Sequence, residues 1–210
     1  MNTIRLTTAL AISAITAVGY LAISTIIAPA SAQTQATQHN DIIRALRPRT
    51  RGVTPVPNEN HSHKELDRLI ERLRAPAKSD ASVVRQQIQK IIDDEELPSL
   101  DFEIYFDTNS AAIRPESIPT LTKLGLALRA PELASSTFLI AGHTDARGSN
   151  RYNLSLSQRR AAAVRKFLVD AISIGPKHLV AVGFGEEQLK RPDYPASGEN
   201  RRVQITNLTY

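Results

Sequence analysis

The chain reads TFLIAGHTDARGSNRYNLSLSQRRAAAVRKFLVDAI over residues 137–172, and this stretch decides the fold. It opens with an apolar run, Thr137 to Ala141, that is typical of a buried strand. A polar loop with two glycines follows, from Gly142 to Arg151. From Asn153 to Ile172 apolar residues recur at helical spacing, which predicts an amphipathic helix. Its apolar face carries Leu156, Ala163, Val164, Phe167, Leu168 and Ala171.

One position on that face is charged. Arg160 lies four residues after Leu156 and four before Val164, where the period calls for an apolar side chain. A guanidinium keeps its charge in proteins, so it must meet an acceptor or stay open to a ligand. Asp145 precedes it by 15 residues, just after the apolar strand. The pair predicts either a receptor for a small zwitterion or an internal salt bridge that orders the loop against the helix.

The other segments from residue 101 to 210 complete an α+β domain. Strand signals lie at Phe102–Phe106, Leu179–Val182 and Arg202–Asn207. Ile118–Leu128 carries leucines on one helical face and a proline in its first turn. The predicted order is therefore βαβαββ, which implies a mixed sheet covered by helices. We expect the last strand to run antiparallel to its neighbour.

Residues 1–32 have the pattern of a signal peptide. Arg5 is the only charge before a largely apolar run of about 19 residues, Ala9 to Ile27, and Ala30-Ser31-Ala32 is a small-x-small cleavage site. The run is also about long enough to cross a membrane, so a retained anchor is the alternative to cleavage. Both alternatives predict an exported protein.

Residues 33–100 are expected to form a partly helical linker or extension. Lys64–Arg74 and Ser82–Ile92 repeat apolar residues every three or four positions, and such short helices would pack on the following domain or on a partner. Asp41 is a candidate N-cap for a short helix before them. A cluster of arginines indicates a solvated linker or, alternatively, contact with an anionic surface. These are Arg44, Arg47, Arg49 and Arg51.

The composition excludes several classes of function. The net charge is +5, but basic and acidic residues are mixed, 11 and 10 over residues 33–100 and 14 and 11 from residue 101 onward. With only 5% aromatic residues as well, nucleic acid is not an expected partner. The chain has no cysteine, which excludes disulfides, thiolate metal ligands, a cysteine nucleophile and a cysteine-linked lipid. We expect no cofactor.

A set of short segments in register resembles one known family. The segments are Phe106-Asp107-Thr108-Asn109-Ser110, Gly142-His143-Thr144-Asp145, Gly148, Tyr152-Asn153, Leu156-Ser157, Arg160-Ala161, Val164, Gly183-Phe184-Gly185-Glu186 and Asn200-Arg201-Arg202-Val203. Together they resemble the OmpA-like C-terminal domain, the periplasmic peptidoglycan-binding module shared with peptidoglycan-associated lipoproteins and flagellar motor stator proteins. The resemblance covers residues from about 102 to 208, half of the chain.

The resemblance implies a ligand and a set of site residues. Asp145 would accept the side-chain ammonium of the diaminopimelate in a peptidoglycan stem peptide, and Arg160 would hold its carboxylate. Asn153, Asn109 and Arg201 match supporting positions. The implied function is non-catalytic peptidoglycan binding that anchors the envelope to the cell wall, in the periplasm or at the outer membrane. Residues 33–100 would then be free for an envelope partner.

Other interpretations stay open at this point. Residues 9–27, if retained, would suit a motor- or stator-like or structural envelope protein. A cell-wall hydrolase would need Asp145 and His143 as catalytic groups, but no third residue lies at a telling spacing for catalysis or metal binding. His61-Ser62-His63 is a weak metal pattern, so we expect no metal site. Ser155, or alternatively Ser157, is the expected N-cap of the long helix.

Overall fold

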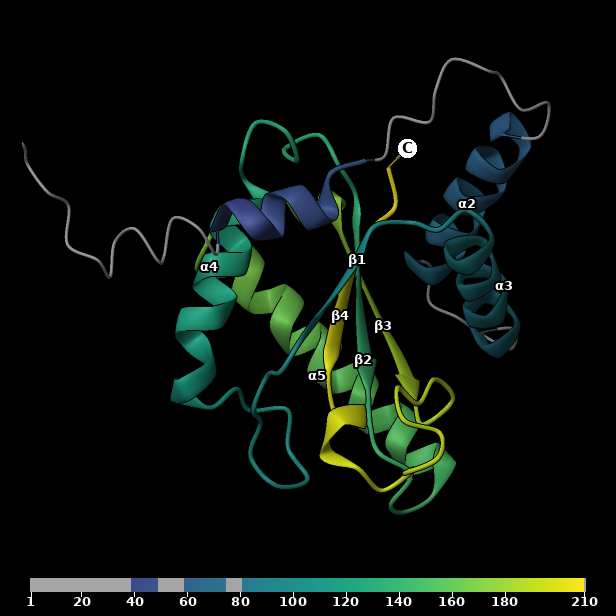
Figure 1. The fold of residues 1–210 in the computed structure, drawn as a ribbon, viewed down its shortest axis with the longest axis vertical. Coiled ribbons are helices and arrows are strands. Elements are labelled where there is room, and N and C mark those ends of the chain that lie inside the picture. Colours follow the sequence, from purple (N-terminus) through teal and green to yellow (C-terminus); the bar gives the residue numbers. More distant parts are fainter. Residues whose placement is uncertain (1–38, 49–58, 75–80, 210) are drawn as a thin grey trace, which may run out of the picture.

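A four-stranded mixed sheet forms the centre of the molecule (Figure 1). The computed structural model describes residues 39–48, 59–74 and 81–209. The strands lie in the order β1-β4-β2-β3. Strand β4 runs antiparallel to β1 and to β2, whereas β2 and β3 are parallel, so the predicted direction of the last strand is confirmed. The strands are β1 (Ser99–Phe102), β2 (Phe138–His143), β3 (Leu179–Gly185) and β4 (Val203–Asn207).

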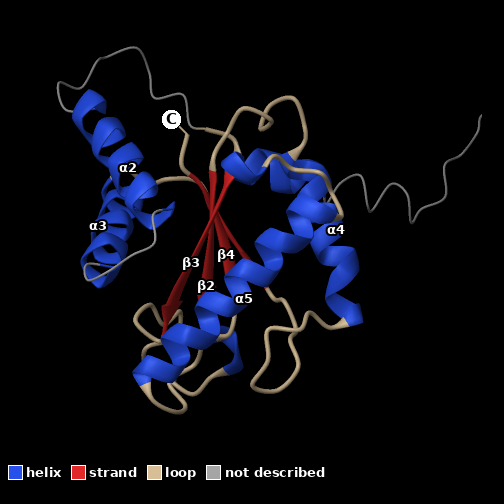
Figure 2. Cartoon of the chain, turned by 180° about the vertical axis from the view of Figure 1, so that it is seen from behind, coloured by secondary structure: helices blue, strands red, loops and turns tan. Residues whose placement is uncertain are grey.

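Helices cover both faces of this sheet (Figures 1 and 2). One face packs against α4 (Ile118–Leu128), α5 (Asn150–Asp170) and a helical segment at 39–46. The opposite face packs against the hairpin of α2 (Glu59–Arg74) and α3 (Ala81–Asp94). The loops between these elements contain short 3-10 helices, which are η1 (Pro115–Ser117), η2 (Pro176–His178) and η3 (Gly198–Asn200).

Strand β2 shows why both faces of the sheet must be covered by helices. All six of its residues are buried. Phe138 and Ile140 join the core beneath α4 and α5, whereas Leu139 and Ala141 join the core beneath α2 and α3. Side chains of a strand alternate between faces, so an unbroken apolar run requires cover on each side. The two helices expected in the extension therefore pack on the following domain, which was the first of the two alternatives.

Helix α5 lies close to the backbone of the sheet. A Cβ at Gly142 would lie 2.4 Å from the carbonyl oxygen of Ser157, and one at Gly183 would lie 2.3 Å from the amide nitrogen of Gln158. Only glycine permits this approach. The Gln158 side chain then bonds the edge of β3, donating to the Ala181 carbonyl and accepting from the Gly183 amide. The glycines thus fix the position of the helix that carries Arg160.

Some predicted boundaries are wrong. The first strand is Ser99–Phe102, not Phe102–Phe106, because its ladder with β4 ends at the pair of Phe102 and Val203. Phe106 makes only an isolated bridge to Ile113. Helix α5 begins at Asn150, and its N-cap is Ser149 rather than Ser155, with the Ser149 hydroxyl accepting from the Tyr152 amide. The predicted bounds of α4 are confirmed.

The N-terminal predictions are covered only in part. The predicted signal peptide at residues 1–32 lies outside the described residues, as do Arg49 and Arg51. Asp41 lies inside the helical segment 39–46 and not before it, so it is not an N-cap of that segment. Within the described ranges, no helix combines the length and the apolar character needed to span a bilayer.

Candidate functional site

The candidate site lies where the parallel strands β2 and β3 end, beside the first turns of α5 (Figure 1). The loop after β2 is held by backbone bonds: Thr144 donates to the Gly185 carbonyl at 2.8 Å, and Ala146 donates to the Pro195 carbonyl at 3.0 Å. The Arg147 amide donates to Oδ1 of Asp145 at 3.2 Å. These bonds fix the Asp145 carboxylate at the mouth of the site.

Asp145 pairs with Arg201. The distance from Oδ2 to the guanidinium Nη1 is 2.7 Å, and the two side chains are 10% and 51% exposed. The internal salt bridge that the sequence offered as an alternative is therefore present with a different arginine. The Asp145 carboxylate is therefore buried, whereas the arginine that pairs with it is half exposed.

Arg160 lies close enough to Asp145 to feel its charge and is half-buried. Its Nε donates to the Ser110 carbonyl at 3.0 Å, and its guanidinium carbon lies 4.9 Å from the centre of the Phe106 ring. Among the described residues it makes no ion pair with a carboxylate. Burial lowers the pKa of Arg160, and the charge of Arg201 acts in the same direction, whereas Asp145 raises that pKa. The guanidinium stays cationic and retains donors for an anion.

Asn153 supports the site from below and does not line its surface. It is 2% exposed. Its Nδ2 donates to the carbonyls of Asp145 and Arg147, at 3.2 and 3.1 Å, and to the Glu186 carboxylate. Its amide thus holds the loop that presents Asp145, and a direct role of Asn153 in ligand binding stays a prediction.

Asn109 belongs to the loop that gives Arg160 its carbonyl partner. It is exposed and has a left-handed φ of 55°, a conformation that asparagine tolerates better than most residues. The turn is closed by the Ser110 amide, which donates to the Asp107 carbonyl at 3.0 Å. The structure thus brings Asp145, Arg160 and Arg201 together and places Asn109 on the adjoining loop.

The comparisons with known proteins place these residues within one family. The model of the OmpA family matches residues 105–203, which include every site residue described above. Residues 105–203 form an OmpA family domain.

The OmpA family domain also accounts for the similarity to individual proteins. The peptidoglycan-associated lipoprotein of Mesorhizobium japonicum is 35% identical, over 49% of this chain and 61% of that protein. The protein of the same name from Pseudomonas aeruginosa is 34% identical, over 48% and 59%. The chain thus spans about three fifths of the length of these relatives. The crystal structure of the peptidoglycan-associated lipoprotein from Burkholderia pseudomallei is 31% identical, covering 52% of this chain and 88% of that one, with a TM-score of 0.43.

His143 comes just before the loop that carries Asp145, and its side chain is buried. It is 3% exposed, and its ring stacks on Phe184 with centroids 5.5 Å apart. Burial, with a smaller contribution from the Arg202 charge, lowers its pKa from 6.5 to about 3, so the ring is neutral. A buried imidazole whose pKa is this low is a weak base and is poorly placed to take a proton from a substrate. Among the described residues no group of His, Asp and Glu could hold a metal ion.

Sequence reasoning missed two contacts of the OmpA family domain. The stacking of Arg160 on Phe106 joins residues 54 positions apart, and the bond from Asn153 to Glu186 joins residues 33 apart. Phe106 and Glu186 both lie in segments that carry the family resemblance. That resemblance was the available signal, but it did not say which side chains would meet.

Proposed function

We propose that this protein binds peptidoglycan without catalysis and anchors the cell envelope to the wall, in the periplasm or at the outer membrane. The ligand group is the diaminopimelate of a stem peptide. The names of the two lipoprotein relatives support peptidoglycan as the polymer. The observation that carries the finer proposal is the half-buried Arg160, which forms no ion pair with a carboxylate among the described residues. Nearby, Asp145 pairs with Arg201, whose side chain is half exposed.

The charges of Asp145 and Arg160 match those at one end of diaminopimelate. The far end of diaminopimelate carries an ammonium and a carboxylate. Arg160 offers a planar pair of donors to the carboxylate, and Asp145 accepts from the ammonium. Arg201, released from Asp145, would turn toward a further carboxylate of the same peptide. Each charge-assisted bond contributes about 1.5–3 kcal/mol, and ordering costs offset much of the sum. A single contact near micromolar affinity follows, and many contacts on one polymer add avidity.

Co-sedimentation with isolated sacculi tests this site. The purified protein should pellet with sacculi, and Asp145→Ala and Arg160→Ala should remain largely in the supernatant. Arg160→Lys should weaken binding about tenfold, because lysine lacks the planar pair of donors. Lys166→Ala is the matched control, since Lys166 is an exposed cation of the same helix that pairs with Asp170. If both alanine variants pellet like the wild type, this site assignment is wrong.

A second measurement separates binding from hydrolysis. Sacculi incubated with the protein should release no soluble fragments, in keeping with the buried His143. Release that depends on Asp145 would replace the proposal with an enzyme.

The proposed division of the chain is a signal peptide at residues 1–32, an extension at 33–100 and the binding domain at 101–210. The mass of the native protein tests the first boundary. Loss of 32 residues would establish cleavage, whereas an intact N-terminus would favour the anchored, stator-like alternative. In the extension, α2 and α3 use their apolar faces on the sheet, so an envelope partner would meet their outer, charged faces.

A further inference from the structure

We infer that the connection between β3 and β4 holds a saccharide subsite, centred on Tyr194, that takes an N-acetylhexosamine of the glycan strand. The inference rests on the proposed function and extends it from the stem peptide to the sugar. Tyr194 is 62% exposed, the most exposed of the large hydrophobic side chains in the described residues. It lines an open, mostly apolar hollow. The hollow is formed by Arg191, Asp193, Tyr194, Pro195, Ala196, Ser197 and Glu199.

The tyrosine ring is largely exposed and has one cation against it. The guanidinium carbon of Arg191 lies 5.2 Å from the ring centre, and the same guanidinium pairs with Glu199 at 2.9 Å. A cation held against one face fixes the ring without covering all of it. An exposed aromatic face next to a proline suits the C–H face of a pyranose, while the phenol and the polar rim can bond its hydroxyl and acetamido groups.

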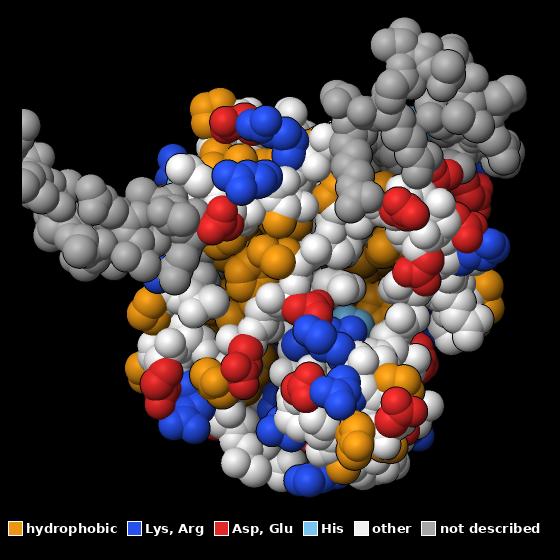
Figure 3. Space-filling model, in the orientation of Figure 1, with side chains coloured by type: hydrophobic (Ala, Val, Ile, Leu, Met, Phe, Trp, Pro, Cys, Tyr) orange, Lys and Arg blue, Asp and Glu red, His pale blue; other side chains and the backbone are white. Residues whose placement is uncertain are grey.

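The charges around the hollow favour a neutral ligand. Arg191 and Glu199 neutralise each other, and Asp193 is the remaining charge of the lining. A phosphate or nucleotide would need an excess of cations there. A neutral sugar needs both hydrogen-bond donors and hydrogen-bond acceptors, and the side chains of Tyr194, Ser197 and Asp193 supply them. Figure 3 shows hydrophobic surface among side chains of both charges over this end of the molecule.

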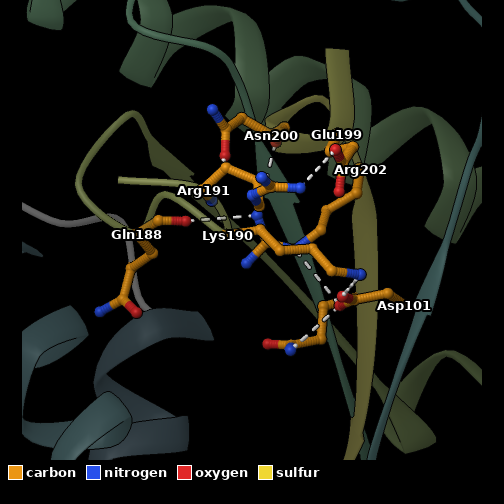
Figure 4. A network of polar contacts seen from close by, with 8 residues as sticks. Asp101, Gln188, Lys190, Arg191, Glu199, Asn200 and Arg202 are labelled. Carbon is orange, nitrogen blue, oxygen red and sulfur yellow. Dashed lines mark hydrogen bonds and ion pairs between the residues drawn. The ribbon is translucent and has the colours of Figure 1, made fainter. Parts of the chain in front are cut away.

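A network of polar contacts holds the connection, although it has little regular structure (Figure 4). The buried Asn200 accepts from the Arg191 amide at 2.8 Å and donates to the carbonyls of Tyr194 and Pro195, both at 3.0 Å. Asp101 of β1 ties down the two ends of the connection by pairing with Lys190 and Arg202, at 2.8 and 3.2 Å. A preorganised surface binds a weak ligand at a lower entropic cost.

The segment that forms the hollow adjoins the proposed stem-peptide site of Asp145 and Arg160. The Pro195 carbonyl accepts from the Ala146 amide, next to Asp145. Arg201, two residues beyond Glu199 of the lining, pairs with the Asp145 carboxylate. In peptidoglycan the sugar and the diaminopimelate are joined through only two amino acids, so they lie close together along the polymer. Occupation of both places by one muropeptide is part of the inference.

Calorimetry with the full chain tests the subsite. The probes are the free tripeptide L-Ala-γ-D-Glu-diaminopimelate and the same tripeptide on its N-acetylglucosaminyl-N-acetylmuramyl disaccharide. The wild type should bind the disaccharide form about fivefold more tightly, the scale of one aromatic contact. Tyr194→Ala should abolish this gain and leave the affinity for the free tripeptide unchanged. Tyr194→Phe should keep most of the gain, and Tyr105→Ala, which removes an exposed tyrosine outside the connection, should keep all of it.

A peptide-free probe separates this inference from the proposed function. In the wild type a β-1,4 tetramer of N-acetylglucosamine should shift the amide resonances of residues 191–199, and these shifts should vanish in Tyr194→Ala and persist in Asp145→Ala. Absence of both the tetramer shifts and the disaccharide gain overturns the subsite, even if the free tripeptide binds. Failure of the tripeptide to bind, with the tetramer shifts intact, overturns the stem-peptide site and leaves the saccharide subsite standing.

Discussion

Acid should destabilise this fold through one buried residue, His143, and replacing it should remove that part of the pH dependence. The ring is 3% exposed and its pKa falls from 6.5 to about 3, chiefly because burial disfavours the imidazolium. Arg202 adds to this effect, and Asp101 opposes it. Between pH 6.5 and 3 the unfolded chain therefore binds more protons at this residue than the folded chain does. Stability contributed at this position is present above pH 6.5 and is lost as the pH falls.

The magnitude follows from the two pKa values. At pH 5 the unfolded state gains about 2 kcal/mol from protonating this histidine, since each pH unit below 6.5 contributes about 1.4 kcal/mol. Urea unfolding of the wild type and of His143→Leu at pH 7.5 and pH 5 measures the effect. The free energy of unfolding should fall by about 2 kcal/mol more in the wild type than in the variant, because all other titrating groups are common to both. Equal falls in the two proteins would refute the reasoning.

Two further predictions concern the packing around the site. Gly183→Ala should lower the free energy of unfolding by about 3 kcal/mol and Tm by about 8 °C. Its Cβ would lie 2.3 Å from the amide nitrogen of Gln158, and this backbone atom can move only if α5 moves. An unchanged melting curve would contradict this. Asn200→Ala should lower the free energy of unfolding by about 2 kcal/mol. It should also raise the rate of hydrogen exchange at the Arg191 amide at least about tenfold, because that amide loses its acceptor. An unchanged exchange rate, measured by NMR, would show that other contacts hold the connection.

The sequence predicted the elements better than their ends. Helix α4 has the predicted bounds because leucine periodicity and a proline at its first turn coincide. The start of α5 was wrong because Ser149, Ser155 and Ser157 are all good N-caps. The choice depends on the preceding turn, where Gly148 has a φ of 101°, and spacing alone does not reveal that turn. The first strand was displaced because its end is set by the partner strand β4, more than 90 residues away.

In the site, likewise, the sequence identified residues but not the contacts between them. Arg160 stood out because a charge interrupted an apolar face, and Asp145 because it ended an apolar strand. The side chains that contact Arg160 and Asp145 could not be predicted from these local patterns. The resemblance supplied Arg201 as a supporting position, but its pairing with Asp145 joins residues 56 positions apart, and the stacking of Arg160 on Phe106 depends on a loop conformation. Contacts between elements follow from packing, and local pattern does not encode them.

The partner of Asp145 changes what each charge contributes to binding. A ligand ammonium that reaches Asp145 replaces a guanidinium already bonded at 2.7 Å, so the exchange gains only the difference between two charge-assisted bonds. A ligand carboxylate that reaches Arg160 replaces no carboxylate among the described residues, and part of the desolvation of that guanidinium has already occurred on folding. Arg160→Ala should therefore weaken binding to sacculi more than Asp145→Ala. The reverse order would mean that Arg201 leaves Asp145 in solution and that the empty site is already open to the ammonium.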